Sequence, residues 1–290
     1  MKFLLIALFL ATGAARAADP HCQAMDTPMP GQHGQLCIYP GDKNADVLYY
    51  LHGKDASADV WGMEGFWAQQ LRDYWTAHGE AAPTVVAVSL GQIWLLGPKT
   101  AAPGGFGSID FFTGRIMPMV EAKLGGIKGR RLLLGDSMGG FNSVQLGMKT
   151  DLFMKVAALC APMGDGNVGP FSTDDQVTAY IKNSTAFKSG HHTFDELKES
   201  FDTIKMVVGA FWTAQEWPAS DPIEMARGLR GPRSAQWYLA AGYFDHYLAY
   251  EGNVAFARVL ADSGTKVDWR PQWGDHCAID IPSLAEFLVK

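Results

Sequence analysis

The chain has 290 residues, 48% of them hydrophobic and 19% charged, which is typical of a globular protein and excludes a disordered or fibrous one. The formal charge of −6 gives no general attraction for nucleic acid or for an anionic membrane surface. At this length we expect one large domain, with two small domains as the alternative.

Residues 1–17 have the features of a secretory signal peptide. Lys2 precedes a short apolar stretch, and Ala15 and Ala17 form a small-residue cleavage site. We therefore expect cleavage after Ala17 and a secreted or periplasmic mature protein. An uncleaved anchor is the alternative, although the apolar stretch is too short to span a bilayer comfortably. Loss of Lys2 and Arg16 makes the mature chain more acidic.

Seven short runs beyond this segment predict strands of a mostly parallel sheet. Most are continuously apolar rather than alternating, as expected for strands buried on both faces. They are residues 35–39, 47–51, 84–90, 131–134, 156–160, 236–240 and 267–272. Helical patterns lie between them, at residues 61–78, 111–124, 141–149, 253–263 and 282–289. Strands that alternate with helices predict an α/β fold with right-handed crossovers.

Residues 163–233 interrupt this alternation, because they contain no convincing strand. Residues 195–208 and 221–229 are predicted helices, the second with Asp221 as N-cap and Pro222 at its first position. Long excursions of this kind usually have a function. We interpret this one as a helical, cap-like insertion over one end of the sheet, within a single domain of residues 18–290. A peripheral subdomain with a packing role only is the alternative.

The four cysteines are Cys22, Cys37, Cys160 and Cys277. An even number in an oxidising compartment predicts two disulfides, for which three pairings are possible. We favour Cys22–Cys37, which would staple the N-terminus, together with Cys160–Cys277, which would join two distant segments. The alternative is that Cys160 is a buried thiol.

Residues 135–139 read Gly-Asp-Ser-Met-Gly and lie between a predicted strand and a predicted helix. In this context Gly-x-Ser-x-Gly indicates a sharp turn that presents Ser137 at the end of the sheet. Gly135 and Gly139 avoid collisions across the turn. The helix that follows directs its N-terminal N–H groups to the same place. The motif predicts a nucleophilic serine.

With this motif the chain resembles the α/β-hydrolases, and within that fold the esterase D and feruloyl-esterase-type serine esterases. The matching stretches are Leu-His-Gly-Lys-Asp at 51–55, the turn and its strand at 130–140, Gly-Tyr-Phe-Asp at 242–245 and Gly-Asp-His at 274–276. They occur in the family's order between residues 47 and 290. The N-terminus and the insertion are not well covered, and no match specifies the substrate.

A nucleophilic serine needs a base, and the base needs a carboxylate. His276 follows the last predicted strand, where the fold places its catalytic histidine. Asp245 is at the family's acid position, with a helix N-cap as its alternative role. Asp221 and Asp275 are weaker candidates for the acid. Four other histidines fit the base position less well: His52, His191, His192 and His246.

The oxyanion of a tetrahedral intermediate needs N–H donors. The backbone N–H of Met138, directly after the nucleophile, is one candidate. The N–H of Lys54, after the strand 47–51, is the other, and Gly53 lets the backbone turn closely. Lys54 and Asp55 are charged where many relatives carry small or apolar residues. The shape of the pocket for the acyl group of the ester therefore stays open.

We expect no cofactor and no metal, because the sequence has no complete phosphate loop, EF-hand register or His-Glu-x-x-His spacing. We also expect no nucleic-acid partner and no membrane span in the mature protein, and the oligomeric state is open. One or two aromatic residues could line a substrate pocket, out of Trp94, Phe106, Trp212, Trp217, Tyr243 and Trp273.

These features predict a secreted or periplasmic serine esterase that hydrolyses small-molecule or polymer-linked carboxylic esters through an acyl-enzyme. An acyltransferase with the same Ser137, His276 and Asp245 is one alternative. A non-catalytic binding protein on a hydrolase scaffold is another. A thioesterase acting on a glutathione adduct, common among similar proteins, is disfavoured by the export signal.

Overall fold

The computed structural model describes residues 21–27, 31–42, 46–92, 94, 108–209 and 212–290. The signal peptide expected at residues 1–17 lies outside the described residues. Within the described ranges, no helix has both the length and the apolar character needed to cross a membrane.

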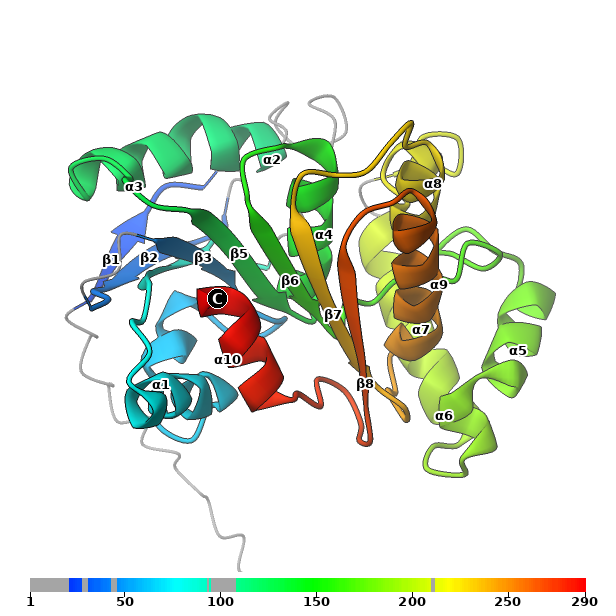
Figure 1. Cartoon of the computed structure of the whole chain (residues 1–290). Coiled ribbons are helices and arrows are strands. Elements are labelled where there is room, and N and C mark those ends of the chain that lie inside the picture. The colour runs from blue at the N-terminus through cyan, green and yellow to red at the C-terminus, as the bar shows by residue number, and fades with distance from the viewer. Residues whose placement is uncertain (1–20, 28–30, 43–45, 93, 95–107, 210–211) are drawn as a thin grey trace, which may run out of the picture.

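An eight-stranded sheet runs through the molecule in the order β1-β2-β4-β3-β5-β6-β7-β8 (Figure 1). Strand β2 pairs antiparallel with both of its neighbours, β1 and β4. All other neighbouring strands, β3 included, pair in parallel. The strands are β1 (Cys22–Met25), β2 (Gly34–Tyr39), β3 (Val47–Leu51), β4 (Thr84–Ser89), β5 (Arg131–Asp136), β6 (Lys155–Leu159), β7 (Gln236–Gly242) and β8 (Val267–Gln272).

This sheet confirms the α/β class and all seven predicted strands. Each central strand is buried on both faces, and for this reason the runs are continuously apolar. Strand β1 escaped prediction because it is short and half exposed. It places Cys22 directly opposite Cys37 in the antiparallel register, and these two residues form a disulfide, as predicted.

Helices cover both faces of the sheet, so the molecule has two main cores. On one face lie α1 (Trp67–His78) and α10 (Ile281–Val289). On the other lie α2 (Ser108–Phe111), α3 (Met117–Lys123), α4 (Met138–Lys149) and α9 (Ala249–Asp262). Neighbouring side chains of a strand point to opposite faces. Tyr49 therefore belongs to the second core and Tyr50 to the first.

Two predicted helices are divided in the structure. The helix expected at 61–78 is a 3-10 turn, η1 (Ala58–Gly62), followed by α1, with Gly65 at a φ of +78° between them. That left-handed backbone does not fit a continuous helix. The helix expected at 111–124 is divided into α2, a π-helical stretch, η2 (Phe112–Ile116), and α3. The remaining predicted helices correspond to α4, α9 and α10.

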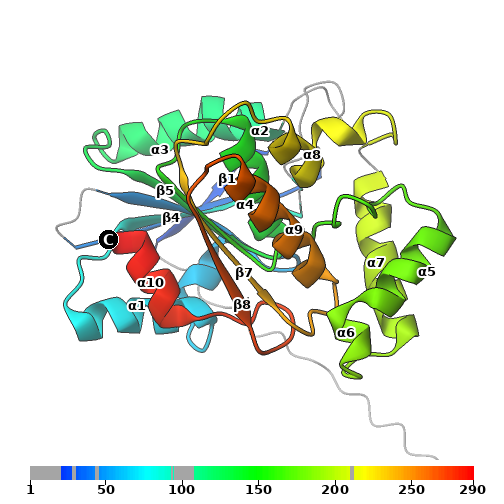
Figure 2. The ribbon, with the colours of Figure 1, turned by 45° about the vertical axis from the view of Figure 1, so that its right-hand side comes forward.

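Between β6 and β7 the described residues form helices and no strand, in agreement with the predicted helical insertion. The elements are α5 (Asp174–Asn183), α6 (Thr185–Lys188), α7 (Phe194–Gly209), η3 (Trp217–Ala219) and α8 (Pro222–Arg227). Figures 1 and 2 show α5, α6 and α7 beyond the sheet, on the side of α9. Asp221 caps α8 as expected, since its carboxylate accepts the N–H groups of Ile223 and Glu224.

Candidate active site

Ser137 lies in the sharp turn between β5 and α4. Its backbone has φ 53° and ψ −119°, a conformation that non-glycine residues rarely adopt. Its N–H donates to the carbonyl of Leu159 at 2.9 Å. A Cβ at Gly135 would collide with the backbone of Gly139, and one at Gly139 would collide with the carbonyl of Leu51. Only glycine fits at these two positions, so the turn depends on both.

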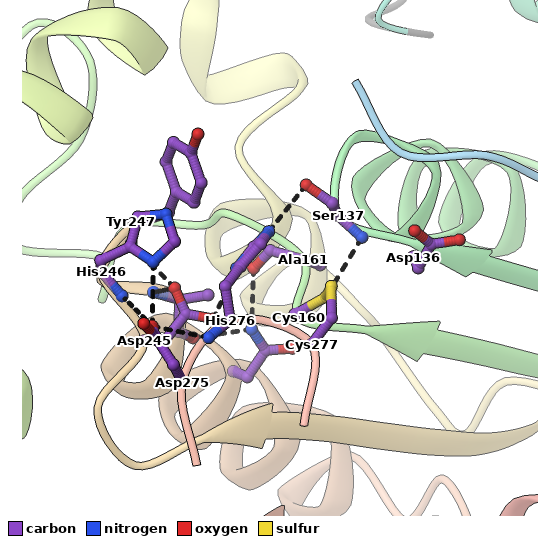
Figure 3. The surroundings of a disulfide bond; sticks show 12 residues. Asp136, Ser137, Cys160, Ala161, Asp245, His246, Tyr247, Asp275, His276 and Cys277 are labelled. Carbon is purple, nitrogen blue, oxygen red and sulfur yellow. Dashed lines mark hydrogen bonds and ion pairs between the residues drawn. A yellow bond between two sulfur atoms is a disulfide. The ribbon is translucent and has the colours of Figure 1, made fainter. Parts of the chain in front are cut away.

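A chain of two hydrogen bonds joins Ser137 to His276 and Asp245 (Figure 3). His276 Nε2 lies 2.9 Å from Ser137 Oγ, and His276 Nδ1 lies 2.8 Å from Asp245 Oδ2. The two partners come from loops after β8 and β7. Asp245 is fully buried, and its other oxygen accepts the N–H of Tyr247 at 2.9 Å. The structure thus brings together the three residues that the sequence singled out.

The surroundings of His276 favour its protonated form. Burial alone would lower the pKa of this imidazole. The carboxylate of Asp245 acts against that effect through its charge and its hydrogen bond, and the net result is a raised pKa. An imidazole in this position can accept a proton from Ser137 and hold it as a stabilised cation.

The loop after β3 packs against the turn that carries Ser137. A Cβ at Gly53 would lie 3.3 Å from the Cβ of Ser137. Met138 is the first residue of α4, so no carbonyl of that helix accepts its N–H. Lys54 follows Gly53, and its side chain forms an exposed ion pair with Asp55 at 2.7 Å. The candidate oxyanion donors therefore lie in two segments that touch at the nucleophile.

Asp136, which the sequence analysis did not single out, is a buried carboxyl group directly before the nucleophile. Its Oδ1 accepts the hydroxyl of Tyr50 at 2.7 Å, and its carboxylate also accepts the N–H of Gly53. Burial raises its pKa from 3.8 to about 6, against the opposing effect of these hydrogen bonds. Asp136 thus ties the loop after β3 to the serine turn.

The rival acids have other partners. Asp275 Oδ1 accepts the backbone N–H groups of His276, at 2.6 Å, and of His246, at 3.1 Å. It forms no hydrogen bond with the His276 ring, which is occupied by Ser137 and Asp245. Asp221 caps α8 and accepts the indole N–H of Trp217 at 2.9 Å. Neither carboxylate is the partner of His276 Nδ1.

A disulfide joins Cys160 to Cys277, the second predicted pair (Figure 3). Cys277 follows His276 directly, and Cys160 follows β6. The sulfur of Cys160 also accepts the N–H of Ser137 at 3.3 Å. The bridge therefore anchors the loop of the candidate base to the turn of the candidate nucleophile, a role that spacing alone could not indicate.

A small apolar pocket lies between the nucleophile helix and the insertion. Its free volume is about 20 Å³, room for about one water molecule. Its lining includes Phe141, Met163, Tyr180, Phe201, Trp217 and Tyr247. Phe141 lies one helical turn after Ser137, and the ring of Tyr247 is 4.7 Å from that of His276. The pocket is therefore next to the reacting groups.

Of the five aromatic residues proposed for a pocket that the structure describes, only Trp217 lines this one. Trp94 packs against Phe141, and Trp212 is buried in the core. Tyr243 stacks on Tyr250, and Trp273 is 80% exposed. Phe106 lies outside the described residues. Most of the aromatic side chains that line the pocket belong to residues that the sequence did not single out for it.

The parallel sheet, the serine turn and the flanking helices define the chain as an α/β-hydrolase. The chain belongs to the Esterase family, whose family model matches residues 29–266. It is accordingly a hydrolase of the carboxylesterase class. A search of curated proteins finds no match.

Several solved structures share this fold. A ferulic acid esterase is 19% identical with a TM-score of 0.61, over 92% of this chain and 93% of that one. An S-formylglutathione hydrolase from Agrobacterium tumefaciens is 14% identical with a TM-score of 0.60, over 92% and 90%. MPT51 from Mycobacterium tuberculosis is 16% identical with a TM-score of 0.60, over 91% and 95%. At these identities the likeness extends to the fold alone.

Proposed function

We propose that the protein is a secreted or periplasmic serine esterase in which Ser137, His276 and Asp245 form the catalytic triad. The observation that carries this proposal is the hydrogen-bond chain from the buried Asp245 through His276 to the Ser137 hydroxyl. The backbone N–H groups of Met138 and Lys54 are the proposed oxyanion donors.

In the first step His276 Nε2 takes the proton of Ser137 Oγ while that oxygen attacks the ester carbonyl carbon. The electron pair of the carbonyl moves to its oxygen, which accepts hydrogen bonds from Met138 and Lys54. Collapse of this intermediate breaks the bond to the alcohol oxygen, which leaves with the proton from His276. Asp245 stabilises the imidazolium that exists between these events.

In the second step water repeats the attack on the acyl-enzyme. His276 takes a proton from the water, and the new tetrahedral intermediate expels Ser137 Oγ. The serine recovers its proton from His276, and the carboxylic acid leaves. No cofactor is needed, since all proton transfers use the same imidazole.

The pocket between α4 and the insertion supports a preference for esters with a small apolar group. Apolar and aromatic side chains dominate its lining, so transfer of an apolar group from water is favourable there. Its small volume disfavours long chains in this conformation of the insertion.

A panel of p-nitrophenyl esters tests the proposal, with Ser137→Ala as the decisive variant. Loss of the nucleophile should lower kcat by several orders of magnitude while the circular dichroism spectrum is unchanged. Ser189→Ala, at an exposed position of the insertion, should keep the activity of the parent protein. Activity that persists in Ser137→Ala would contradict the assignment, and an inactive parent protein would favour a binding role.

Hydrolysis and acyl transfer differ in the acceptor of the acyl group. Assays with an added alcohol, analysed for free acid and for new ester, separate the two. We expect free acid as the main product. A predominance of new ester would make the protein an acyltransferase with the same triad.

Two observations support export. Residues 1–17 have the sequence pattern of a signal peptide, and all four cysteines are paired in disulfides, which persist in oxidising compartments. Mass spectrometry of the protein from a periplasmic or culture-medium fraction should find an N-terminus at Ala18. Recovery of the full-length chain from the cytosol would contradict export.

A further inference from the structure

Three side chains with metal-binding chemistry meet beside the catalytic loops and have no part in the proposed reaction. His192 comes from the insertion, between α6 and α7. His246 follows Asp245, and Asp275 precedes His276. One candidate ligand atom from each residue lies within 4.8 Å of the other two. We call these three residues the His-His-Asp cluster.

Two distances within the cluster are close to the spacing of ligands around one small ion. His246 Nδ1 lies 2.9 Å from Asp275 Oδ1, and His192 Nε2 lies 3.3 Å from Asp275 Oδ2. Ligand atoms about 2.1 Å from a tetrahedral zinc are about 3.4 Å apart.

His192 adds a second observation. Its Nε2 is buried and lies 3.3 Å from Asp275 Oδ2, but it makes no hydrogen bond within the described part of the chain. A metal ion held between these two atoms would satisfy the buried ring nitrogen. The side chain of Asp275 is 49% exposed, so the cluster is open to solvent and to ions on one side.

We propose that the His-His-Asp cluster is a binding site for a divalent transition metal, with Zn²⁺ as its preferred ion. Two imidazoles and one carboxylate are ligands that zinc accepts, whereas Mg²⁺ and Ca²⁺ require mostly oxygen. Water completes the coordination on the exposed side. Binding replaces the hydrogen bond between His246 Nδ1 and Asp275. The Nδ1 proton passes through water to Nε2 of the same ring, so that Nδ1 offers its lone pair to the metal, as His192 Nε2 does.

The position of the site suggests that a bound ion holds three segments of the chain together, as a clamp. Its ligands come from the insertion, from the loop of Asp245 and from the loop of His276, so one ion would join three segments. The other group of three potential ligands among the described residues, Cys160, His276 and Cys277, is not a comparable site, because its cysteines form a disulfide. The clamp lies outside the reacting atoms and does not depend on the proposed esterase mechanism.

Isothermal titration of the untagged, EDTA-treated mature protein with ZnCl₂ tests the site directly. We expect one zinc per chain and no measurable heat from CaCl₂ or MgCl₂. His192→Gln and Asp275→Asn should each weaken binding at least tenfold. His191→Gln is the matched control, because His191 neighbours His192 but stacks its ring on Phe244 outside the cluster.

Thermal unfolding with and without zinc gives a readout independent of activity. Zinc should raise the Tm of the parent protein and of Ser137→Ala, since an ion that binds only the folded chain stabilises it. It should leave the Tm of the His192→Gln, Asp275→Asn double variant unchanged. Absence of zinc binding in the parent protein would overturn the proposal. Binding unaffected by both substitutions would also overturn it.

Discussion

Ser137 illustrates how much of the site depends on backbone conformation. Its φ of 53° is tolerated because Gly135 and Gly139 leave room for a turn that any side chain would block. The hydrogen bond from its N–H to Leu159 holds this conformation. The motif predicted this residue because the same glycines that permit the turn are visible in the sequence.

The other two proposed triad members were predictable from their places after two strands. Asp136 and the His-His-Asp cluster were not. Asp136 acquires its role from Tyr50, which lies on the neighbouring strand β3. His192 meets Asp275 only because the insertion folds back toward the loop after β8. Contacts between segments distant in sequence leave no local pattern for such residues.

The buried carboxyl of Asp136 predicts a pH-dependent contribution to stability. Its pKa is 3.8 when exposed and about 6 in the folded protein, so between these values the folded state binds more protons. This contribution to the free energy of unfolding is greatest below pH 3.8. It falls as the pH rises through 6, by roughly 3 kcal/mol in total.

Asp136→Asn removes this titration while it keeps an oxygen for the hydroxyl of Tyr50. The stability of the variant relative to the parent protein should therefore increase by up to about 3 kcal/mol between pH 4 and pH 7. Urea unfolding at pH 4, 5, 6 and 7 measures the difference. A difference that is independent of pH would show that Asp136 does not titrate in this range.

At the scale of elements, strands were easier to predict than helices. Strands buried on both faces have apolar runs that end where the burial ends, as in β3, whose bounds the sequence predicted to the residue. Helix patterns do not reveal local breaks. The division before α1 depends on the left-handed backbone at Gly65, which hydrophobic periodicity does not report.

The two disulfides should have different effects on activity. Removal of Cys160–Cys277, by Cys160→Ser with Cys277→Ser, frees the loop of His276 and should lower kcat at least tenfold at a temperature where the variant is folded. Removal of Cys22–Cys37 opens a loop with a sequence separation of 15 residues, and β1 lies at the opposite edge of the sheet from β7 and β8. It should cost about 3 kcal/mol of stability with kcat unchanged.

Steady-state kinetics and chemical unfolding of both double variants test this distinction, and each variant is the control for the other. A kcat of the Cys160→Ser, Cys277→Ser variant equal to that of the parent protein would show that the bridge beside His276 has no positioning role. A large loss of kcat in the N-terminal variant would show that β1 matters to the site.

Helix α7 contributes Phe201 to the pocket beside Ser137. Phe201→Ala should enlarge the pocket and raise the kcat/KM for p-nitrophenyl hexanoate relative to the acetate by about tenfold, since each accommodated methylene contributes about 1–3 kcal/mol. Phe201→Leu should show a smaller shift in the same direction, at a lower cost in stability.

Met206→Ala is the matched control for this prediction, because Met206 lies on the same helix and is 68% exposed. Its chain-length preference should be that of the parent protein. An unchanged preference in Phe201→Ala and Phe201→Leu would show that the pocket does not receive the part of the substrate that varies in this panel.

At the scale of the whole molecule, the insertion has a small core of its own that extends into the hydrolase fold. That core includes Leu248, which precedes α9, and the hydroxyl of Tyr180 donates to the carbonyl of Leu248 at 3.2 Å. Trp217 and Ile223, from the second half of the insertion, pack in the core that also covers the sheet. The insertion and the sheet are therefore linked by buried contacts.

These shared contacts predict that residues 18–290 unfold as one cooperative unit. A segment whose core is completed by another segment loses that core when the other unfolds, so the two should melt together. The calorimetric enthalpy of the mature protein should equal its van't Hoff enthalpy, provided that the disulfides stay intact and unfolding is reversible. Tryptophan fluorescence and far-ultraviolet circular dichroism should give coincident transitions. Two separate transitions, with a calorimetric enthalpy well above the van't Hoff value, would instead make the insertion an independent domain.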